Sequence, residues 1–139
     1  MSMKDILNNE FAKLSYDNES NSIVTVWKKP TTSETCRNIF SIIVEKLVQY
    51  KADAFINDIY HQGIVDTENR LWLQNEIFPK AYAGGLRKVA TITPNDVFSR
   101  FYEERVKNGV GVNSIDLEFQ YFQDLISARE WVMNQEVPV

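Results

Sequence analysis

The sequence predicts a single α/β domain built on one mixed, mostly parallel five-stranded sheet with four main helices. Segments typical of strands alternate with segments typical of helices, in the order β-β-α-β-α-β-α-β-α. Such alternation is typical of chains whose helices cover a mainly parallel sheet. The chain has 139 residues, of which 44% are hydrophobic, enough to bury a core without disulfides or metals. We therefore expect one domain spanning residues 1–139.

The first two strands are expected at residues 11–16 and 22–28. The first alternates loosely between apolar and polar side chains, and the second is rich in β-branched and aromatic residues. Residues 17–21, between them, are of the polar types that favour turns. The two segments should therefore pair as an antiparallel hairpin.

The first helix follows this hairpin. Thr31 and Glu34 have the spacing of a capping box, and apolar residues then recur at helical spacing. A short apolar segment, residues 54–59, comes soon afterwards and predicts a third strand, reached by a crossover. The apolar stripe of the helix comprises Cys36, Ile39, Phe40, Ile43, Val44, Leu47 and Val48.

A second helix is expected to begin at Asp66 or Thr67, because either side chain can cap it. Residues 71–73 are Leu-Trp-Leu, and three successive residues cannot share one stripe, so one of them should be exposed. Pro79 lacks a backbone donor and should bend or end this helix, which leaves two unequal pieces.

The last third of the chain predicts two more strands and two more helices. The strands are expected at residues 88–93 and 115–121, and Asp124 should cap the final helix. Thr93 and Pro94 begin a shorter helix between the strands, followed by a loop at residues 108–113. The apolar face of that shorter helix comprises Val97, Phe98, Phe101 and Tyr102.

Composition excludes several classes of partner and location. The formal net charge is -4 and the 15 Lys and Arg residues are scattered, which excludes a general attraction to nucleic acid. No apolar run approaches the ~20 residues of a membrane span, and no signal peptide is visible. Cys36 is the single cysteine, so the chain suits a reducing compartment and we expect it to be cytoplasmic.

Two segments carry a resemblance to a known family. The first comprises Trp72, Phe78, Pro79, Ala81 and residues 85–90, and the second comprises residues 119–124, Ala128, Trp131 and Val132. Together with the order of elements, they resemble the STAS/SpoIIAA-like family of small stand-alone bacterial proteins, relatives of the anti-sigma factor antagonist domain. The resemblance spans nearly the whole chain and implies the SpoIIAA/STAS-like fold.

The resemblance also implies a function. It suggests a domain without enzymatic activity, used for protein association or for holding a small ligand. In anti-sigma factor antagonists a serine that follows an aspartate at the end of a central strand is phosphorylated. Asp58 matches the place of that aspartate, but Ile59 follows it and residues 60–66 contain no serine. The resemblance therefore does not carry this phosphorylation switch to the present chain.

The candidate interaction or ligand-binding residues follow from the expected sheet. The loop at residues 58–67 and the turn at residues 93–96 should both lie at the carboxyl edge, where open α/β sheets place ligands. We expect Asp58 to accept hydrogen bonds from nearby loop amides. The candidates are Asp58, Tyr60, His61, Thr67, Trp72, Thr93 and Asn95.

Catalytic and metal sites find little support in the sequence. His61 is the single histidine, and a general base needs positioned partners, for which Asp58 and Asp66 are the nearby carboxylates. The usual catalytic zinc set needs further ligands, so we predict no metal site and no cofactor. Cys36 lies on the apolar stripe of the first helix and is expected to be a buried core residue.

Three hypotheses about function remain. The leading one is a domain for protein–protein interaction or regulation, working as a homodimer. The alternative is a carrier of an apolar small molecule or lipid, because a second set of family relatives resembles Sec14-like domains and aromatic residues make up 12% of the chain. The third and least favoured is a hydrolytic enzyme that uses His61.

Overall fold

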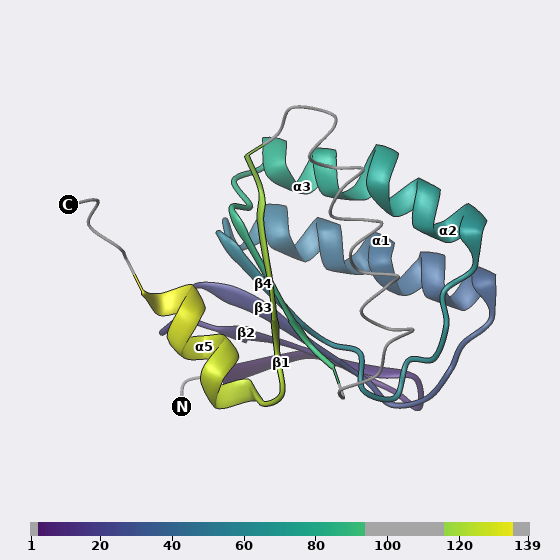
Figure 1. The fold of residues 1–139 in the computed structure, drawn as a ribbon, viewed down its shortest axis with the longest axis horizontal. Helices are drawn as coiled ribbons and strands as arrows, with labels where there is room; N and C mark the ends of the chain where they lie inside the picture. Colours follow the sequence, from purple (N-terminus) through teal and green to yellow (C-terminus); the bar gives the residue numbers. More distant parts are fainter. Residues whose placement is uncertain (1–2, 94–115, 135–139) are drawn as a thin grey trace.

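The fold is a mixed sheet with helices on both faces (Figure 1). It is known from a computed structural model, which describes residues 3–93 and 116–134. Within these residues the sheet has six strands, and their order across the sheet is their order in the sequence. The strands are β1 (Met3–Asn8), β2 (Ala12–Asp17), β3 (Ser22–Trp27), β4 (Ala54–Asp58), β5 (Lys88–Ile92) and β6 (Glu118–Phe122).

The pairing of the strands divides the sheet into two parts. β1, β2 and β3 form an antiparallel meander, whereas β3, β4, β5 and β6 are parallel. The predicted α/β class and the predicted hairpin are confirmed. The prediction of five strands is wrong, because the N-terminal segment forms β1 as an additional antiparallel edge strand. The helix predicted at residues 97–102 lies outside the described residues. The other three predicted helices are present, at residues 33–49, 67–83 and 125–133.

Helices cover the two faces of the sheet unequally. Figure 1 shows α1, α2 and α3 on one side and α5 on the other. The 17-residue α1 lies against β3, and α5 lies against β4, β5 and β6. The helical segments are α1 (Ser33–Gln49), α2 (Thr67–Trp72), the π-helix η1 (Leu73–Ile77), α3 (Phe78–Ala83) and α5 (Leu125–Met133).

The first helix begins differently from the prediction. Its N-cap is Thr32, whose Oγ1 accepts a hydrogen bond from the backbone N–H of Thr35 at 3.2 Å. The predicted capping box of Thr31 and Glu34 is therefore wrong by one residue. Two adjacent threonines can each cap a helix, and the choice between them depends on where the chain leaves β3.

Pro79 does not end the second helical segment. The π-turn η1 joins α2 to α3, and the backbone N–H of Phe78 donates to the carbonyl of Leu73, five residues earlier. This turn places Pro79 in the first turn of α3, where the missing backbone donor costs little. The helix therefore changes its hydrogen-bond register just before the proline and continues in three pieces, so the prediction of two pieces is wrong.

The apolar interior has one cluster on each face of the sheet. The larger cluster packs α1, η1 and α3 onto one face and includes Trp27, Phe40 and Phe55. The smaller cluster packs Ala128 and Val132 of α5 onto aliphatic side chains of β3, β4 and β5. Both faces are thus covered, and the loops at the ends of the strands remain for function.

Candidate functional site

The carboxyl ends of β4, β5 and β6 bring two of the predicted segments together. The backbone N–H of Ile59 donates to the carbonyl of Ile92 at 2.9 Å, and the N–H of Thr93 donates to the carbonyl of Phe122 at 3.0 Å. The loop that begins after Asp58 and the residue Thr93 therefore lie at one edge of the sheet, as predicted. Asn95, the remaining candidate in this turn, lies outside the described residues.

Asp58 closes β4 with a hydrogen bond within the loop. Its Oδ1 accepts from the backbone N–H of Tyr60 at 3.0 Å, as predicted for this carboxylate. Burial raises the pKa of Asp58 above its ordinary value, while the Tyr60 hydrogen bond and the charge of His61 act in the opposite direction with smaller effect. Asp58 is thus held in place chiefly as a structural acceptor.

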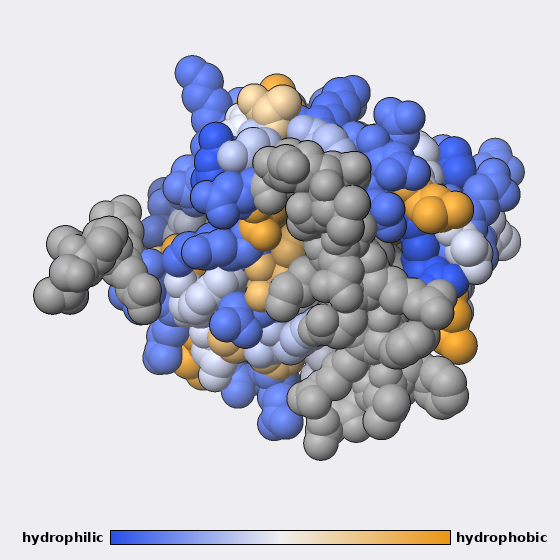
Figure 2. Space-filling view, turned by 45° about the horizontal axis from the view of Figure 1, so that its top comes forward, coloured by the Kyte–Doolittle hydropathy of each residue, from blue (hydrophilic) through white to orange (hydrophobic). Residues whose placement is uncertain are grey.

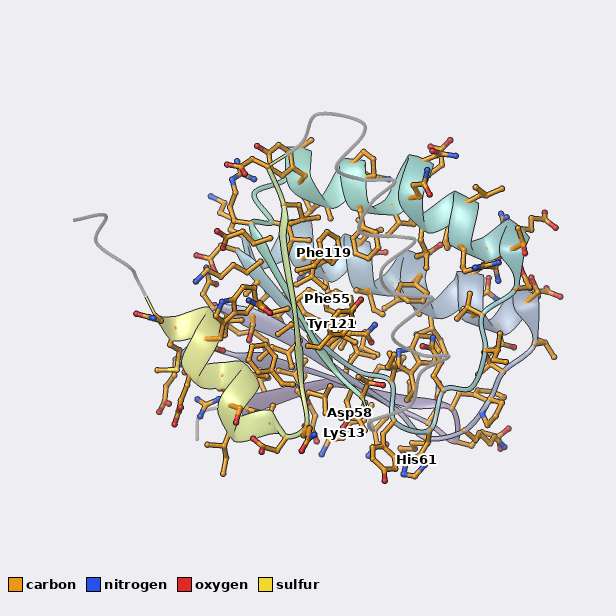
Figure 3. All side chains as sticks on the ribbon, viewed as in Figure 1. Lys13, Phe55, Asp58, His61, Phe119 and Tyr121 are labelled. Atoms are coloured by element: carbon orange, nitrogen blue, oxygen red, sulfur yellow. The ribbon has the colours of Figure 1, made fainter. Side chains whose placement is uncertain are left out.

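His61 is exposed and has an aromatic neighbour. Its ring meets the ring of Tyr60 edge-on, with ring centres 4.8 Å apart. Figure 3 shows His61 at the same edge as Asp58 but farther from the core residues Phe55 and Phe119. Within the described residues, no hydrogen bond or ion pair joins the His61 ring to Asp58 or Asp66.

The loop at residues 59–66, which we call the edge loop, has a buried residue at every third position. Gln62 and Val65 are buried, whereas the side chains of Tyr60 and Ile64 are 53% and 84% exposed. Gly63 turns the backbone at a φ of 79°, a conformation that favours glycine. The edge loop is therefore anchored, and it presents two large apolar side chains to solvent.

Ile64 is absent from the predicted candidates. The signal for it in the sequence was weak, because an isoleucine beside a valine in a short loop reads equally well as core. Only the burial of every third residue along the anchored loop separates the exposed Ile64 from the buried Val65. The structure therefore adds one residue to the candidate site that sequence reasoning missed.

Asp66 and Thr67 begin α2 through local hydrogen bonds. Asp66 is the N-cap, and its Oδ1 accepts from the backbone N–H of Asn69 at 2.7 Å. The hydroxyl of Thr67 accepts from Nη2 of Arg70 at 2.7 Å. The predicted capping role of Asp66 is confirmed, and Thr67 takes part in the first turn of the helix.

Trp72 links α2 to α1. The guanidinium of Arg37 lies over its ring at 4.8 Å, and Nε of Arg37 donates to Oδ1 of the buried Asn69 at 2.7 Å. Leu73 is buried and Leu71 is half-exposed, which confirms that the three successive residues cannot share one stripe. Among the described contacts none joins Trp72 to the edge loop, so this candidate belongs to the packing of the two helices.

Reactive and metal-binding groups do not converge in the described parts of the chain. Burial, and secondarily the charge of Asp66, raise the pKa of the buried Cys36 thiol to about 11, so the thiol is protonated at neutral pH. The described residues contain no group of three or more side chains that could hold a metal ion. The prediction of Cys36 as a core residue is confirmed.

A concave surface lies at the opposite end of the parallel strands, where β4, β5 and β6 begin. It is an open groove of about 840 Å³ between the amino ends of β4, β5 and β6 and the end of α5. Its lining includes the charged residues Glu19, Asp53, Arg87, Lys88 and Glu118. The surface visible in Figure 2 is likewise mostly hydrophilic, and its hydrophobic residues occur in small separate groups.

Comparison with known proteins gives one structural neighbour. No family model and no curated protein matches the sequence. Among solved structures, SiaC of Pseudomonas aeruginosa is similar at 14% identity with a TM-score of 0.50, covering 88% of this chain and 100% of that chain. At this identity the similarity shows a shared α/β fold.

In the described part of the chain, no helix has both the length and the apolar character that crossing a membrane requires.

Proposed function

We propose that this chain is a regulatory domain of the STAS/SpoIIAA-like type, without enzymatic activity, which binds a protein partner through the edge loop. One observation carries the proposal: Tyr60 and Ile64 are exposed on a loop whose neighbouring residues Gln62 and Val65 are buried. Single exposed apolar residues are ordinary on protein surfaces. Two of them on one anchored loop, at the edge where open sheets bind ligands, favour an interaction surface.

The sequence supports the regulatory part of this proposal. The segments around Phe78 and Trp131 resemble STAS/SpoIIAA-like proteins, and the similarity to SiaC is consistent with a fold of this kind. A cytoplasmic location and a homodimer are further parts of the proposal. They rest on the single cysteine and on the family resemblance.

The contacts of the two candidate catalytic groups favour a binding role over an enzymatic one. The Asp58 carboxylate accepts from the Tyr60 amide, and the His61 ring lies against the Tyr60 ring. A general base needs a partner that fixes its tautomer and orientation. The described residues provide no such partner for His61, so we propose that it contributes to the interaction surface.

The proposal is tested by quantitative affinity capture from native lysate with matched variants. Ile64→Asp places a charge at the centre of the proposed surface. Ile126→Asp is the control, because Ile126 is 71% exposed on α5, on the other face of the sheet. We expect a stoichiometric partner with the wild type and with Ile126→Asp, and its loss with Ile64→Asp. Equal capture by both variants, or no stoichiometric partner in any growth state, would overturn the proposal.

A small-molecule carrier is the second candidate function. The groove of about 840 Å³ lies within the size range of ligand pockets. Its charged lining favours a polar ligand over the apolar molecule or lipid that a Sec14-like carrier would hold. Native mass spectrometry of freshly purified protein tests this candidate: a co-purifying mass supports the carrier, and the mass of the bare chain contradicts it.

A further inference from the structure

A small cavity, partly open to solvent, lies between the edge loop and the first turn of α1. Its wall includes Thr31, Ser33, Cys36 and Asp66, and the side chain of Gln62 also lines it. Gln62 is only 4% exposed, yet neither its Nε2 nor its Oε1 has a hydrogen-bond partner among residues 3–93 and 116–134. Buried amides are almost always hydrogen-bonded, so this amide points to a bound molecule in the cavity.

The size of the cavity limits what can bind. Its volume is about 20 Å³. A water molecule needs roughly 10–15 Å³ of such space, whereas pockets for organic ligands measure roughly 300–1,000 Å³. The cavity therefore accepts a species of the size of one water molecule or one small ion.

The charges around the cavity disfavour an ion of either sign. The Asp66 carboxylate repels an anion. Its charge acts within the cavity, as its contribution to the raised pKa of Cys36 indicates. The amino end of α1 disfavours a cation, and so does the charge of Arg37, which acts on Cys36 in the cavity wall. A neutral molecule that both donates and accepts hydrogen bonds matches the Gln62 amide, which presents one acceptor and two donors.

We propose that this cavity is a hydration site, in which one water molecule hydrogen-bonds to the Gln62 amide and to polar groups at the start of α1. This water links Gln62, in the middle of the edge loop, to the start of α1. Gly63, the next residue, already packs closely on Pro30. A Cβ added to Gly63 would lie only 3.2 Å from the Cγ of Pro30. The site goes beyond the proposed function, because it fixes the position of the edge loop whether or not a partner binds there.

The first test is a crystal structure of the wild-type protein at a resolution that shows ordered water. We expect one water peak within hydrogen-bond distance of Nε2 or Oε1 of Gln62 and of a second polar group of the cavity wall. A cavity without density, a metal ion in it, or a Gln62 side chain that turns to solvent would each overturn the proposal. This test needs no variant and no partner, so its outcome is separate from that of the capture experiment.

The second test measures long-lived water in solution by magnetic relaxation dispersion of water oxygen-17. Gln62→Met has nearly the same shape but no polar atom that can hold water. Gln49→Met makes the same change at an exposed position of α1 and is the control. We expect Gln62→Met to lose the signal of one long-lived water relative to the wild type and Gln49→Met to keep it. Equal signals from the two variants would contradict the hydration site.

Discussion

The guanidinium of Arg129 on α5 donates through Nε to the carboxylate of Asp17 on β2, 2.6 Å away and 112 positions earlier in the sequence. Asp17 is fully buried, and its carboxylate also accepts from the hydroxyl of Ser20 at 2.8 Å and from the backbone N–H of Glu19 at 3.2 Å. Nη2 of Arg129 also donates to Glu19 at 2.8 Å. This cluster fastens the last helix to the turn of the β2–β3 hairpin, and it fixes the position of α5 on its face of the sheet.

Removing the arginine should destabilise the fold strongly. Arg129→Met leaves the buried Asp17 charge without its ion-pair partner, and we expect the free energy of unfolding to fall by about 3 kcal/mol in urea titrations. Lys13→Met is the control, because it removes an exposed pair in which Nζ of Lys13 lies 3.7 Å from Asp5. Exposed pairs contribute about 0–1 kcal/mol. A loss for Arg129→Met no larger than for Lys13→Met would show that Asp17 is solvated or otherwise neutralised.

The same cluster predicts a dependence of stability on acid. Burial raises the pKa of Asp17, but hydrogen bonds from Arg129 and Ser20 and the charge of Arg129 together outweigh it, so the pKa lies below its ordinary 3.8. A lowered pKa in the folded state stabilises the fold above pH 3.8, and this contribution is lost as the pH falls through the folded-state value. The stability advantage of the wild type over Asp17→Asn, measured by urea unfolding at several pH values, should therefore be constant near neutrality and shrink below pH 3.8. An advantage that does not change in acid would be inconsistent with a lowered pKa.

Asp58 should behave in the opposite way. Burial raises its pKa above the ordinary 3.8, so its ionised form destabilises the fold. The favourable contribution is present below pH 3.8 and is lost as the pH rises through the folded-state value. The carbonyl oxygen of asparagine can still accept from the Tyr60 amide. We therefore expect Asp58→Asn to be at least as stable as the wild type at pH 7, with a smaller difference at pH 3. If Asp58→Asn were the less stable protein at pH 7, the ionised carboxylate would have to be a net stabilising group.

The elements that sequence reasoning predicted correctly depend on local signals. Asp66 and Asp124 cap helices through hydrogen bonds to backbone N–H groups three residues later, and both roles are visible in the residue types alone. The strand β4 is a short run of apolar residues after a helix, which is a similarly local pattern.

The features that were missed depend on distant neighbours. The strand β1 has no regular alternation of burial, and it exists because its backbone pairs with the exposed edge of β2. The pairing of Arg129 with Asp17 could not be predicted either, because it depends on which face of the sheet α5 covers. The candidate site shows the same division: the acceptor role of Asp58 followed from the sequence, whereas the exposure of Ile64 and the burial of the Gln62 amide required the folded loop.

Cys36 provides a chemical test of the packing behind the edge loop. Cys36 is 4% exposed and burial raises the pKa of its thiol to about 11, so the thiol is almost entirely protonated at pH 7. Because the thiolate is the reactive form, we expect native protein to react with a disulfide reagent at pH 8 far more slowly than protein unfolded in urea. The reaction should be limited by opening of the structure, and Gln62→Met should accelerate it, since Gln62 lines the same cavity as Cys36. Ile126→Asp, on the opposite face, should react at the wild-type rate. A native thiol that reacts as fast as the unfolded one would show that the packing of α1 against the edge loop does not protect Cys36.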